Sequence, residues 1–189
     1  MVQTIVSALA PVVLALGMVL NWSYDVAAQG QQWSVPRTLG PTSRQDVAYT
    51  QDIAAGSVVV ETGERALYLV LPGGRAYRYA IGVGREGFGW TGVARVGAKQ
   101  EWPAWRPPAE MRARKPGLPE FVPPGPHNPL GARALYLYQN GRDTLYRIHG
   151  TNDNEAVGAA VTSGCFRLSN TDAIDLYNRV PIGASVVVR

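Results

Sequence analysis

Short runs of β-branched and aromatic residues, separated by turn-forming residues, constrain the fold of this chain more than any other feature. Six such runs lie at residues 57–61, 66–71, 76–81, 134–138, 145–148 and 184–188. Their length and composition are typical of strands that pack against a core. The pattern therefore predicts a mainly β domain.

Two pairs of these runs are predicted to form hairpins. Residues 72–75, with the sequence Pro-Gly-Gly-Arg, join the first pair, and residues 139–142, Gln-Asn-Gly-Arg, join the second. Glycine and asparagine supply the backbone angles that tight turns require. His149 follows the second hairpin directly, so we expect it at the C-terminal end of a strand.

One segment carries a clear helix signal. Ser169 is followed three residues later by Asp172, a pattern typical of a helix N-terminus, and Pro181 ends the segment. Residues 82–97 are rich in glycine and suggest no regular element. Residues 102–129 are rich in Pro and Trp and are too irregular for a helix or a long strand. Their aromatic residues favour a packed lid or cleft wall over disorder.

The N-terminal region is predicted to lie outside the folded domain. Residues 2–20 are uncharged and mostly apolar, and Val26 and Ala28 fit a signal-peptidase site, so residues 1–28 are interpreted as an export signal. The apolar run is almost long enough to span a bilayer, which leaves an uncleaved membrane anchor as the alternative. Residues 29–55 are polar and interrupted by prolines, and we expect them to be a linker before a domain at residues 56–189.

The exported part has a basic balance. The chain has 18 Lys and Arg and 14 Asp and Glu, one of which, Asp25, lies in the first 28 residues, so the remainder carries 18 minus 13, or +5. This charge favours anionic surroundings such as wall polymers or lipid headgroups. The bases are scattered and no nucleic-acid module is recognisable, so we expect no nucleic-acid partner. A basic surface without a specific partner fits equally well.

The single cysteine and one of the two histidines suggest the chemistry. Cys165 follows Gly164 and lies sixteen positions after His149. A thiol needs a base to become a nucleophile near neutral pH, and imidazole commonly serves. A lone cysteine is more often a small buried residue, but an unpaired thiol in an exported chain invites oxidation unless it has a use. These residues suggest acyl transfer through a thioester.

The neighbours of Cys165 leave two interpretations open. Arg167 would face the same side as Cys165 if the segment is extended. Its guanidinium could clamp a carboxylate or brace the loop. His127 is expected to be a loop residue and not a second base. One Cys and two His fall short of the usual closed metal site, so no metal is expected.

At this point a resemblance becomes specific. The residues His149, Gly150 and Thr151, followed by residues 163–167 with the sequence Ser-Gly-Cys-Phe-Arg, resemble the signature of the YkuD-type L,D-transpeptidase catalytic domain. Residues 125–131 and 175–183 match the same family. The resemblance covers roughly residues 56–189. It implies a β-sandwich-like domain with one or two short helices and a long Pro/Trp-rich loop.

The resemblance also implies roles for individual residues. Cys165 would be the nucleophile and His149 the general base, with its ring oriented by the carbonyl of Gly150. Backbone N–H groups of Gly164 and Cys165 would form the oxyanion hole. The residues implied to bind substrate are Arg167, Ser163, Thr162 and Thr151. No metal or organic cofactor is implied.

The implied activity is peptidoglycan L,D-transpeptidation in the periplasm or cell envelope of a bacterium. Cys165 would attack a stem tetrapeptide, release D-Ala, and pass the acyl group to an amine to form a 3→3 cross-link. With water or a free D-amino acid as acceptor, the enzyme would be an L,D-carboxypeptidase or an exchanger; a lipoprotein is another possible acceptor. A non-catalytic wall-binding domain is the alternative from another class.

Two positions depart from the family pattern. Ser163 stands where many members have a second histidine, so no role can rest on a second imidazole. Residues 88–92, Phe-Gly-Trp-Thr-Gly, replace the usual Thr-Pro-Thr-Gly, which leaves the composition of the cleft wall open.

Overall fold

The computed structural model describes residues 39–189 of the chain. The predicted export signal at residues 1–28, or anchor, lies outside the described residues, as does the first part of the predicted linker. Among the described residues, no helix combines the length and the apolar character needed to cross a membrane.

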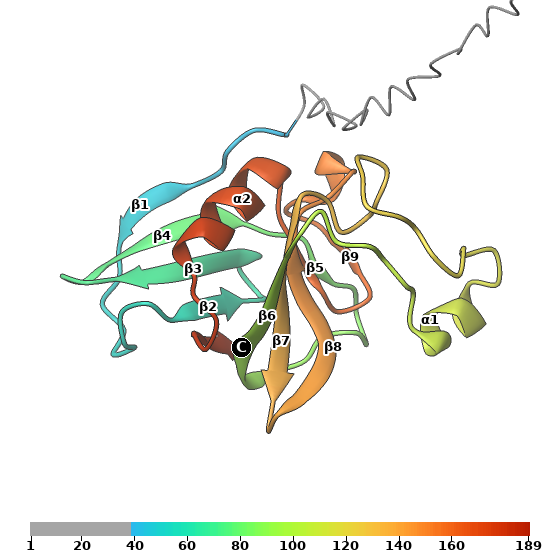
Figure 1. Cartoon of the computed structure of the whole chain (residues 1–189). Helices are drawn as coiled ribbons and strands as arrows, with labels where there is room; N and C mark the ends of the chain where they lie inside the picture. Colours follow the sequence, from blue (N-terminus) through green and yellow to red (C-terminus); the bar gives the residue numbers. More distant parts are fainter. Residues whose placement is uncertain (1–38) are drawn as a thin grey trace, which may run out of the picture. The chain divides into compact units, whose positions relative to one another are not determined.

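Eleven strands form two sheets (Figure 1). Nine of them build one sheet in the order β1-β4-β3-β2-β11-β6-β7-β8-β10, and β5 pairs with β9. The strands are β1 (Gln45–Ala48), β2 (Val58–Glu61), β3 (Ala66–Leu71), β4 (Arg75–Ala80), β5 (Val83–Gly84), β6 (Gly92–Glu101), β7 (Arg133–Gln139), β8 (Arg142–His149), β9 (Ala160–Thr162), β10 (Phe166–Arg167) and β11 (Ser185–Val188). The helices are α1 (Ala109–Arg114), the 3₁₀ turn η1 (Asn154–Ala156) and α2 (Asn170–Arg179). The predicted mainly β class is confirmed.

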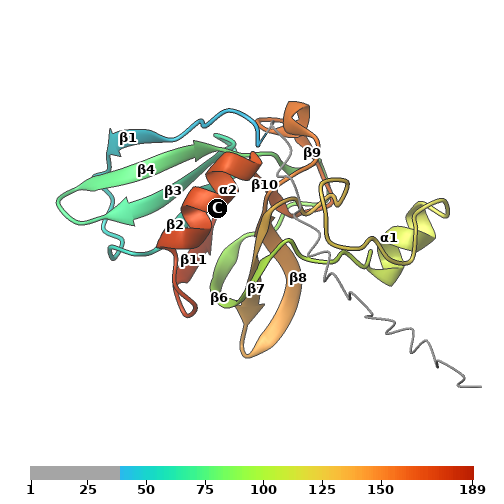
Figure 2. The same cartoon turned by 45° about the horizontal axis from the view of Figure 1, so that its top comes forward.

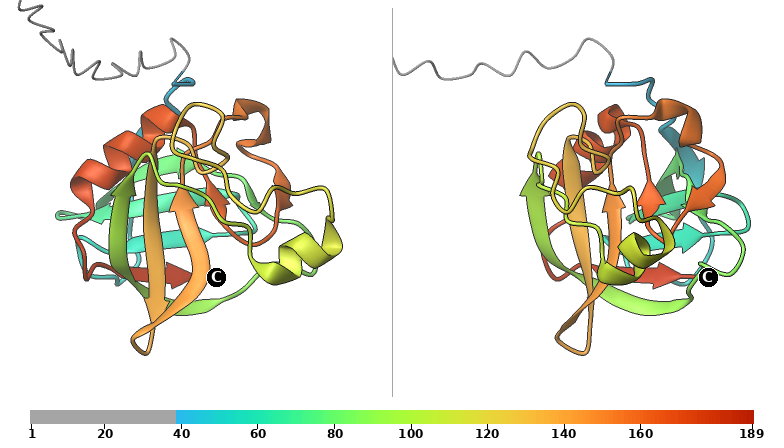
Figure 3. Two further views of the ribbon diagram at one scale, coloured as in Figure 1. Left: turned by 45° about the vertical axis from the view of Figure 1, so that its right-hand side comes forward. Right: turned by 90° about the vertical axis from the view of Figure 1, so that its right-hand side faces the viewer.

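The large sheet bends so that its two ends face each other. Figures 2 and 3 show β6, β7 and β8 running across β2, β3 and β4, with α2 beside them. The core lies between these layers and takes residues from both, including Leu67 and Tyr79 from one side and Leu135 from the other. Leu176 of α2 is also fully buried in this core. Burial of such side chains is the main stabilising contribution to a domain of this size.

The predicted strands and helix are present. Each of the six runs contains a strand, and β8 begins three residues earlier than the run at 145–148. The turn between β7 and β8 is therefore reduced to Asn140 and Gly141, both with positive φ, as a two-residue hairpin requires. The side chain of Ser169 accepts the N–H of Asp172 and caps α2, so the predicted helix start is confirmed.

The longest strand and the shorter α-helix are among the elements that the sequence analysis missed. The ten-residue strand β6 occupies part of the glycine-rich segment, where no strand was expected. Its buried positions are Ala94 and Val96, which are too few to reveal an alternating pattern. At Gly97 a Cβ would collide with the ring of Tyr138, so a glycine there reflects close packing on β7. The Pro/Trp-rich segment contains the six-residue helix α1, which was likewise not expected.

The predicted linker also needs correction. Residues 45–48 form β1, which pairs antiparallel with β4 at the edge of the sheet. Before it, the hydroxyl of Thr42 and the hydroxyl and N–H of Ser43 donate to the buried carboxylate of Asp172, at 2.8, 2.6 and 2.9 Å. Ordered structure therefore begins by residue 39 and not near Gly56. β1 escaped detection because an exposed edge strand needs little apolar sequence.

Asp172→Ala tests how much the N-terminal segment contributes to stability. The change removes the buried acceptor of three hydrogen bonds from residues 42 and 43 and so releases this segment from α2. We expect the free energy of unfolding to fall by about 2–3 kcal/mol, measured by urea denaturation. Asp52→Ala, at an exposed position, serves as the control and should change it little. Equal stability of the two variants would contradict this account.

Candidate active site

The parallel pairing of β8 with β10 brings the two segments singled out in the sequence together. His149 pairs with Arg167, and Ile148 pairs with Phe166. Ile148 and Phe166 are buried in the core. Side chains alternate along paired strands, so His149 and Arg167 lie on the opposite face. Cys165, one residue before Phe166, lies on that same face.

His149 is the last residue of β8 and is only 4% exposed. Its Nδ1 lies 2.5 Å from the carbonyl oxygen of Gly150, which accepts a hydrogen bond from the ring. This tautomer leaves Nε2 without a proton and able to accept one. Burial lowers the pKa of His149 to about 4, against the opposing effect of the Gly150 hydrogen bond. The imidazole is therefore neutral at neutral pH.

Cys165 is partly buried and is the only cysteine in the chain. Its Sγ lies 3.9 Å from the carbonyl oxygen of Leu145. Burial of the thiol raises its pKa, while the backbone N–H of Arg147 and the charges of Arg147 and Arg167 oppose that rise. Both shifts favour the neutral form of each group, thiol and imidazole, near neutral pH.

The thiol turn, residues 162–165, is braced from within. The hydroxyl of Thr162 donates to the carbonyl of Cys165 at 2.7 Å and accepts the N–H of Gly164 at 3.2 Å. Gly164 has a φ of 111°, and a Cβ there would collide with the ring of Tyr146. The Gly164 N–H and the buried Thr162 hydroxyl therefore have partners within the turn, while the roles predicted for them toward an oxyanion and a substrate stay predictions. Ser163 is partly buried on this turn.

The loop after His149 is held by a residue that the sequence analysis missed. The amide of Asn170, the first residue of α2, accepts the N–H groups of Ala132 and Thr151 and donates to the carbonyl of Thr151. The hydroxyl of Thr151 bonds with both backbone groups of Asp153. The nearly fully buried Thr151 therefore braces this loop, and its predicted contact with substrate stays a prediction. No sequence signal distinguishes Asn170 from an ordinary helix-start residue.

Arg167 has features of both a residue that braces the loop and a residue that binds a carboxylate. Its backbone exchanges two hydrogen bonds with Gly82, at 2.7 and 2.9 Å, which braces β10. Its side chain is 20% exposed and forms a loose ion pair, 3.7 Å long, with Asp153. Within residues 39–189 its buried Nε has no hydrogen-bond partner. The guanidinium therefore retains donors that could bind a carboxylate.

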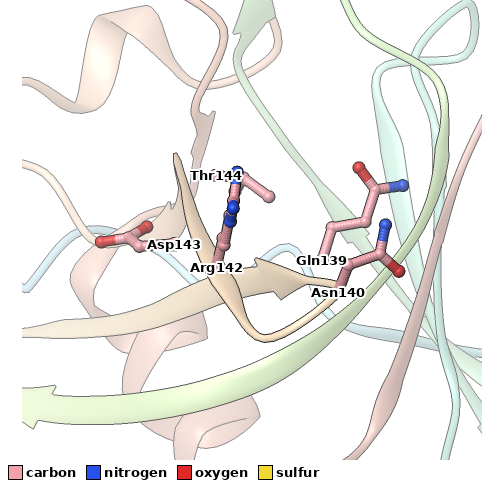
Figure 4. Close-up of a pocket in the computed structure, with 5 residues that line it drawn as sticks. All are labelled: Gln139, Asn140, Arg142, Asp143 and Thr144. Carbon is pink, nitrogen blue, oxygen red and sulfur yellow. The ribbon is translucent and has the colours of Figure 1, made fainter.

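Arg147 is a second residue that the sequence analysis missed. It precedes Ile148 on β8, so its side chain lies on the same face as His149. Both guanidinium nitrogens Nη1 and Nη2 donate to Asp143 at 2.7 Å, and the group stacks 4.2 Å from the centre of the Tyr136 ring. Asp143 lines a hollow of about 500 Å³ at the tip of the β7–β8 hairpin, where it projects away from Gln139 and Asn140 (Figure 4). A fixed cation thus lies beside the thiol.

Aromatic residues form a wall behind the thiol turn. Trp90 stacks on Tyr146 at 4.9 Å between ring centres. Phe88 lies between two cations, with Arg85 at 4.2 Å and Arg114 of α1 at 4.9 Å from its ring centre. The segment 88–92, which departs from the family pattern, therefore connects the thiol turn with the Pro/Trp-rich segment.

The Pro/Trp-rich segment also reaches the loop after His149. The side-chain amide of Asn152 donates to the carbonyl of His127 at 3.0 Å. His127 itself is exposed, as expected for a loop residue. In the part of the chain that the structure describes, no three His, Cys, Asp or Glu side chains are grouped so that they could hold a metal ion.

Comparison with known proteins gives one consistent family. The family model of the L,D-transpeptidase catalytic domain matches residues 55–188. The probable L,D-transpeptidase ErfK/SrfK of Escherichia coli K12 is 36% identical over 168 residues, which are 84% of this chain and 49% of that protein. The chain thus spans about half the length of the curated relatives it matches.

Solved structures show the same fold. A crystal structure from Brucella melitensis, described as a probable carnitine operon oxidoreductase caia, is 43% identical and covers 77% of this chain and 92% of that one, with a TM-score of 0.53. L,D-transpeptidase 3 from Mycobacterium tuberculosis, in complex with a faropenem-derived adduct, is 18% identical. It covers 70% of this chain and 59% of that one, with a TM-score of 0.53.

The buried, neutral His149 predicts a pH-dependent stability. Because folding lowers its pKa from 6.5 to about 4, only the unfolded chain holds the proton between these pH values. The free energy of unfolding should therefore rise by up to about 3 kcal/mol from pH 4 to 6.5. His149→Gln should remove this part of the dependence in urea denaturation, whereas His127→Gln, at an exposed loop position, should retain it. The same profile in both variants would refute the assignment.

Arg147 predicts the reactivity of the thiol. Arg147→Gln removes a cation that opposes the rise in the Cys165 pKa, so alkylation by iodoacetamide at pH 8 should slow by about three- to tenfold. Arg142→Gln, on the same strand but exposed, is the matched control and should react like the unchanged protein. Similar rates in both variants would show that the Arg147 charge does not act on the thiol.

Proposed function

Since the chain belongs to the L,D-transpeptidase catalytic domain family, we propose that it is a cysteine-dependent peptidoglycan L,D-transpeptidase that forms 3→3 cross-links. Cys165 is the nucleophile and His149 the general base. The acyl group is held as a thioester on Cys165 while D-Ala leaves.

The pairing of β8 with β10 is the observation that carries this proposal. It puts Cys165 and His149 on one face of the sheet, and the hydrogen bond from Nδ1 to Gly150 leaves Nε2 as the proton acceptor. A base whose orientation is fixed by a third group is the usual arrangement for activating a nucleophile. Here a main-chain carbonyl supplies the third group.

In the first half-reaction, His149 removes the thiol proton as Sγ attacks the carbonyl between the diamino acid and D-Ala. The low pKa of His149 and the raised pKa of Cys165 oppose proton transfer in the free site, so transfer accompanies attack. Because Gly164 N–H is bound to Thr162, the N–H of Cys165 is assigned as an oxyanion donor. Such a donor is typically worth about 3 kcal/mol. The C–N bond breaks, and the amine of D-Ala leaves with the proton from His149.

In the second half-reaction, the amine of a neighbouring stem attacks the thioester. Neutral His149 takes a proton from this amine and returns it to the Cys165 sulfur as the C–S bond breaks. Water in place of the amine gives L,D-carboxypeptidase activity, and a free D-amino acid gives exchange. A thioester remains reactive toward each of these acceptors without ATP.

The proposed activity also determines where the enzyme acts and which molecules it binds. Peptidoglycan lies outside the cytoplasmic membrane, so the enzyme must be exported, which is consistent with the predicted signal at residues 1–28. The periplasm or cell envelope is the proposed site of action, and stem peptides are the proposed partners. The basic charge of the exported part favours an anionic wall.

The assay incubates the full chain with disaccharide-tetrapeptide and follows the products by mass spectrometry. Cross-linked dimer with release of D-Ala is the expected result. Cys165→Ala should abolish the products without unfolding the protein, and His149→Gln should slow turnover by at least about 100-fold. Tripeptide monomer in place of dimer would assign the carboxypeptidase reaction instead.

A second readout separates an enzyme from a wall-binding module. A solved family member carries a faropenem-derived adduct, so incubation with faropenem should leave a covalent adduct on Cys165 that intact-mass spectrometry detects as an increase in mass. A chain that neither turns over stems nor reacts with faropenem would favour the binding module. Product formation by Cys165→Ala would remove this residue from the mechanism.

A further inference from the structure

A groove lies beside the thiol turn, on the side away from β8. It has a volume of about 400 Å³ and is lined by the turn between β2 and β3, by β5 with the loop that follows it, and by Gly164. This volume is in the range of sites for small ligands. Gly164 directly precedes Cys165, so a molecule in the groove would lie one residue from the thiol.

The groove and β8 flank the thiol turn from opposite sides, because β10 pairs with β8 along one edge and with Gly82, next to β5, along the other. On one side, Tyr146 of β8 approaches Gly164 so closely that a Cβ there would collide with its ring. On the other side, a Cβ on Gly84 of β5 would lie 3.2 Å from the Cα of Gly164 and 2.7 Å from the carbonyl oxygen of Phe88. A peptide that crosses Cys165 can therefore place one part near β8 and another in the groove.

Arg65 is fixed at the groove in an unusual backbone conformation. Its φ is 52°, in the left-handed region that a residue with a side chain seldom adopts. Its Nη1 donates to the carbonyl of Gly158 at 3.0 Å, which holds the guanidinium across the gap between two loops. Backbone strain of this kind gathers where a side chain has a task to perform.

Arg85 is fixed by different contacts. Its backbone N–H donates to the carbonyl of Thr162 in the thiol turn at 3.1 Å, and its guanidinium lies 4.2 Å from the centre of the Phe88 ring. Stacking on a ring occupies the face of a guanidinium and leaves its edge free for a carboxylate. The groove also contains Glu86, so its lining carries two positive charges and one negative charge.

We propose that this groove is a carboxylate subsite, in which Arg65 and Arg85 bind a carboxylate that the acyl-donor peptide carries on the other side of the scissile bond from D-Ala. The inference rests on the proposed function. Under this inference the site has two cationic positions. One is Arg167, on the face of Cys165 and His149, and the other is the Arg65–Arg85 pair across the thiol turn. A donor held at both positions would have its scissile carbonyl fixed over the sulfur.

The test compares two donor peptides that differ only at the carboxylate preceding the diamino acid, as free acid or as carboxamide. For the full-length enzyme we expect the free acid to have the lower KM. Arg85→Gln should raise the KM for the free acid by roughly 10- to 100-fold and change that for the carboxamide by less than about threefold. Arg65→Gly, which suits the positive φ, should act in the same direction. Arg142→Gln is the exposed control.

The outcomes separate this inference from the proposed function. Equal losses for both peptides, or none, in an active enzyme would overturn the carboxylate subsite and leave the transpeptidase proposal intact. If the unchanged enzyme turns over neither peptide, the proposed function fails. The subsite is then tested by calorimetric binding to the Cys165→Ala variant. If Arg85→Gln raises the dissociation constant of the free acid but not that of the carboxamide, the subsite is supported. If both peptides bind equally well, the subsite is overturned.

Discussion

The two-residue pairing of β10 with β8 is the interaction on which the site depends. It pairs residues that lie eighteen positions apart in the sequence, and it turns one face of the pair toward the core and the other toward the candidate site. Phe166 and Ile148 anchor the pair in the core, and this burial sets the register. A shift of one residue would turn Cys165 and His149 into the core and bring Phe166 out. The same packing that stabilises the domain therefore selects the face that His149 and Arg167 occupy.

Rigid support around this pair comes from polar groups with complete sets of partners. Asn170 ties α2 to the loop after His149, and Thr162 closes the thiol turn on itself. Buried polar groups with satisfied hydrogen bonds favour one arrangement over competing ones. In contrast, Arg167 keeps an unpartnered buried nitrogen within the described residues. The contrast distinguishes groups that hold the site from groups that remain available to a ligand.

Sequence reasoning predicted the mainly β fold and singled out Cys165 and His149, but it did not predict the groups that support them. The β-branched runs were recognisable because apolar composition marks buried strands, and a single cysteine near a histidine is a rare combination. β6 was missed because its buried positions are only Ala94 and Val96. Arg147 and Asn170 depend on pairings between distant segments, which no local pattern reports. The sequence also did not reveal that the hydroxyl groups of Thr162 and Thr151 bond to nearby backbone.

The position of β1 has a consequence for how this domain should be delimited. The family match begins at residue 55, seven residues after β1 ends. A fragment cut at that boundary would lose the strand that covers the outer side of β4 and expose a row of unpaired N–H and C=O groups. Uncovered strand borders recruit other chains and promote self-association. The stretch that composition marks as a tether thus pairs with β4 and leaves only the four-residue strand β1 as the free edge at this end of the sheet.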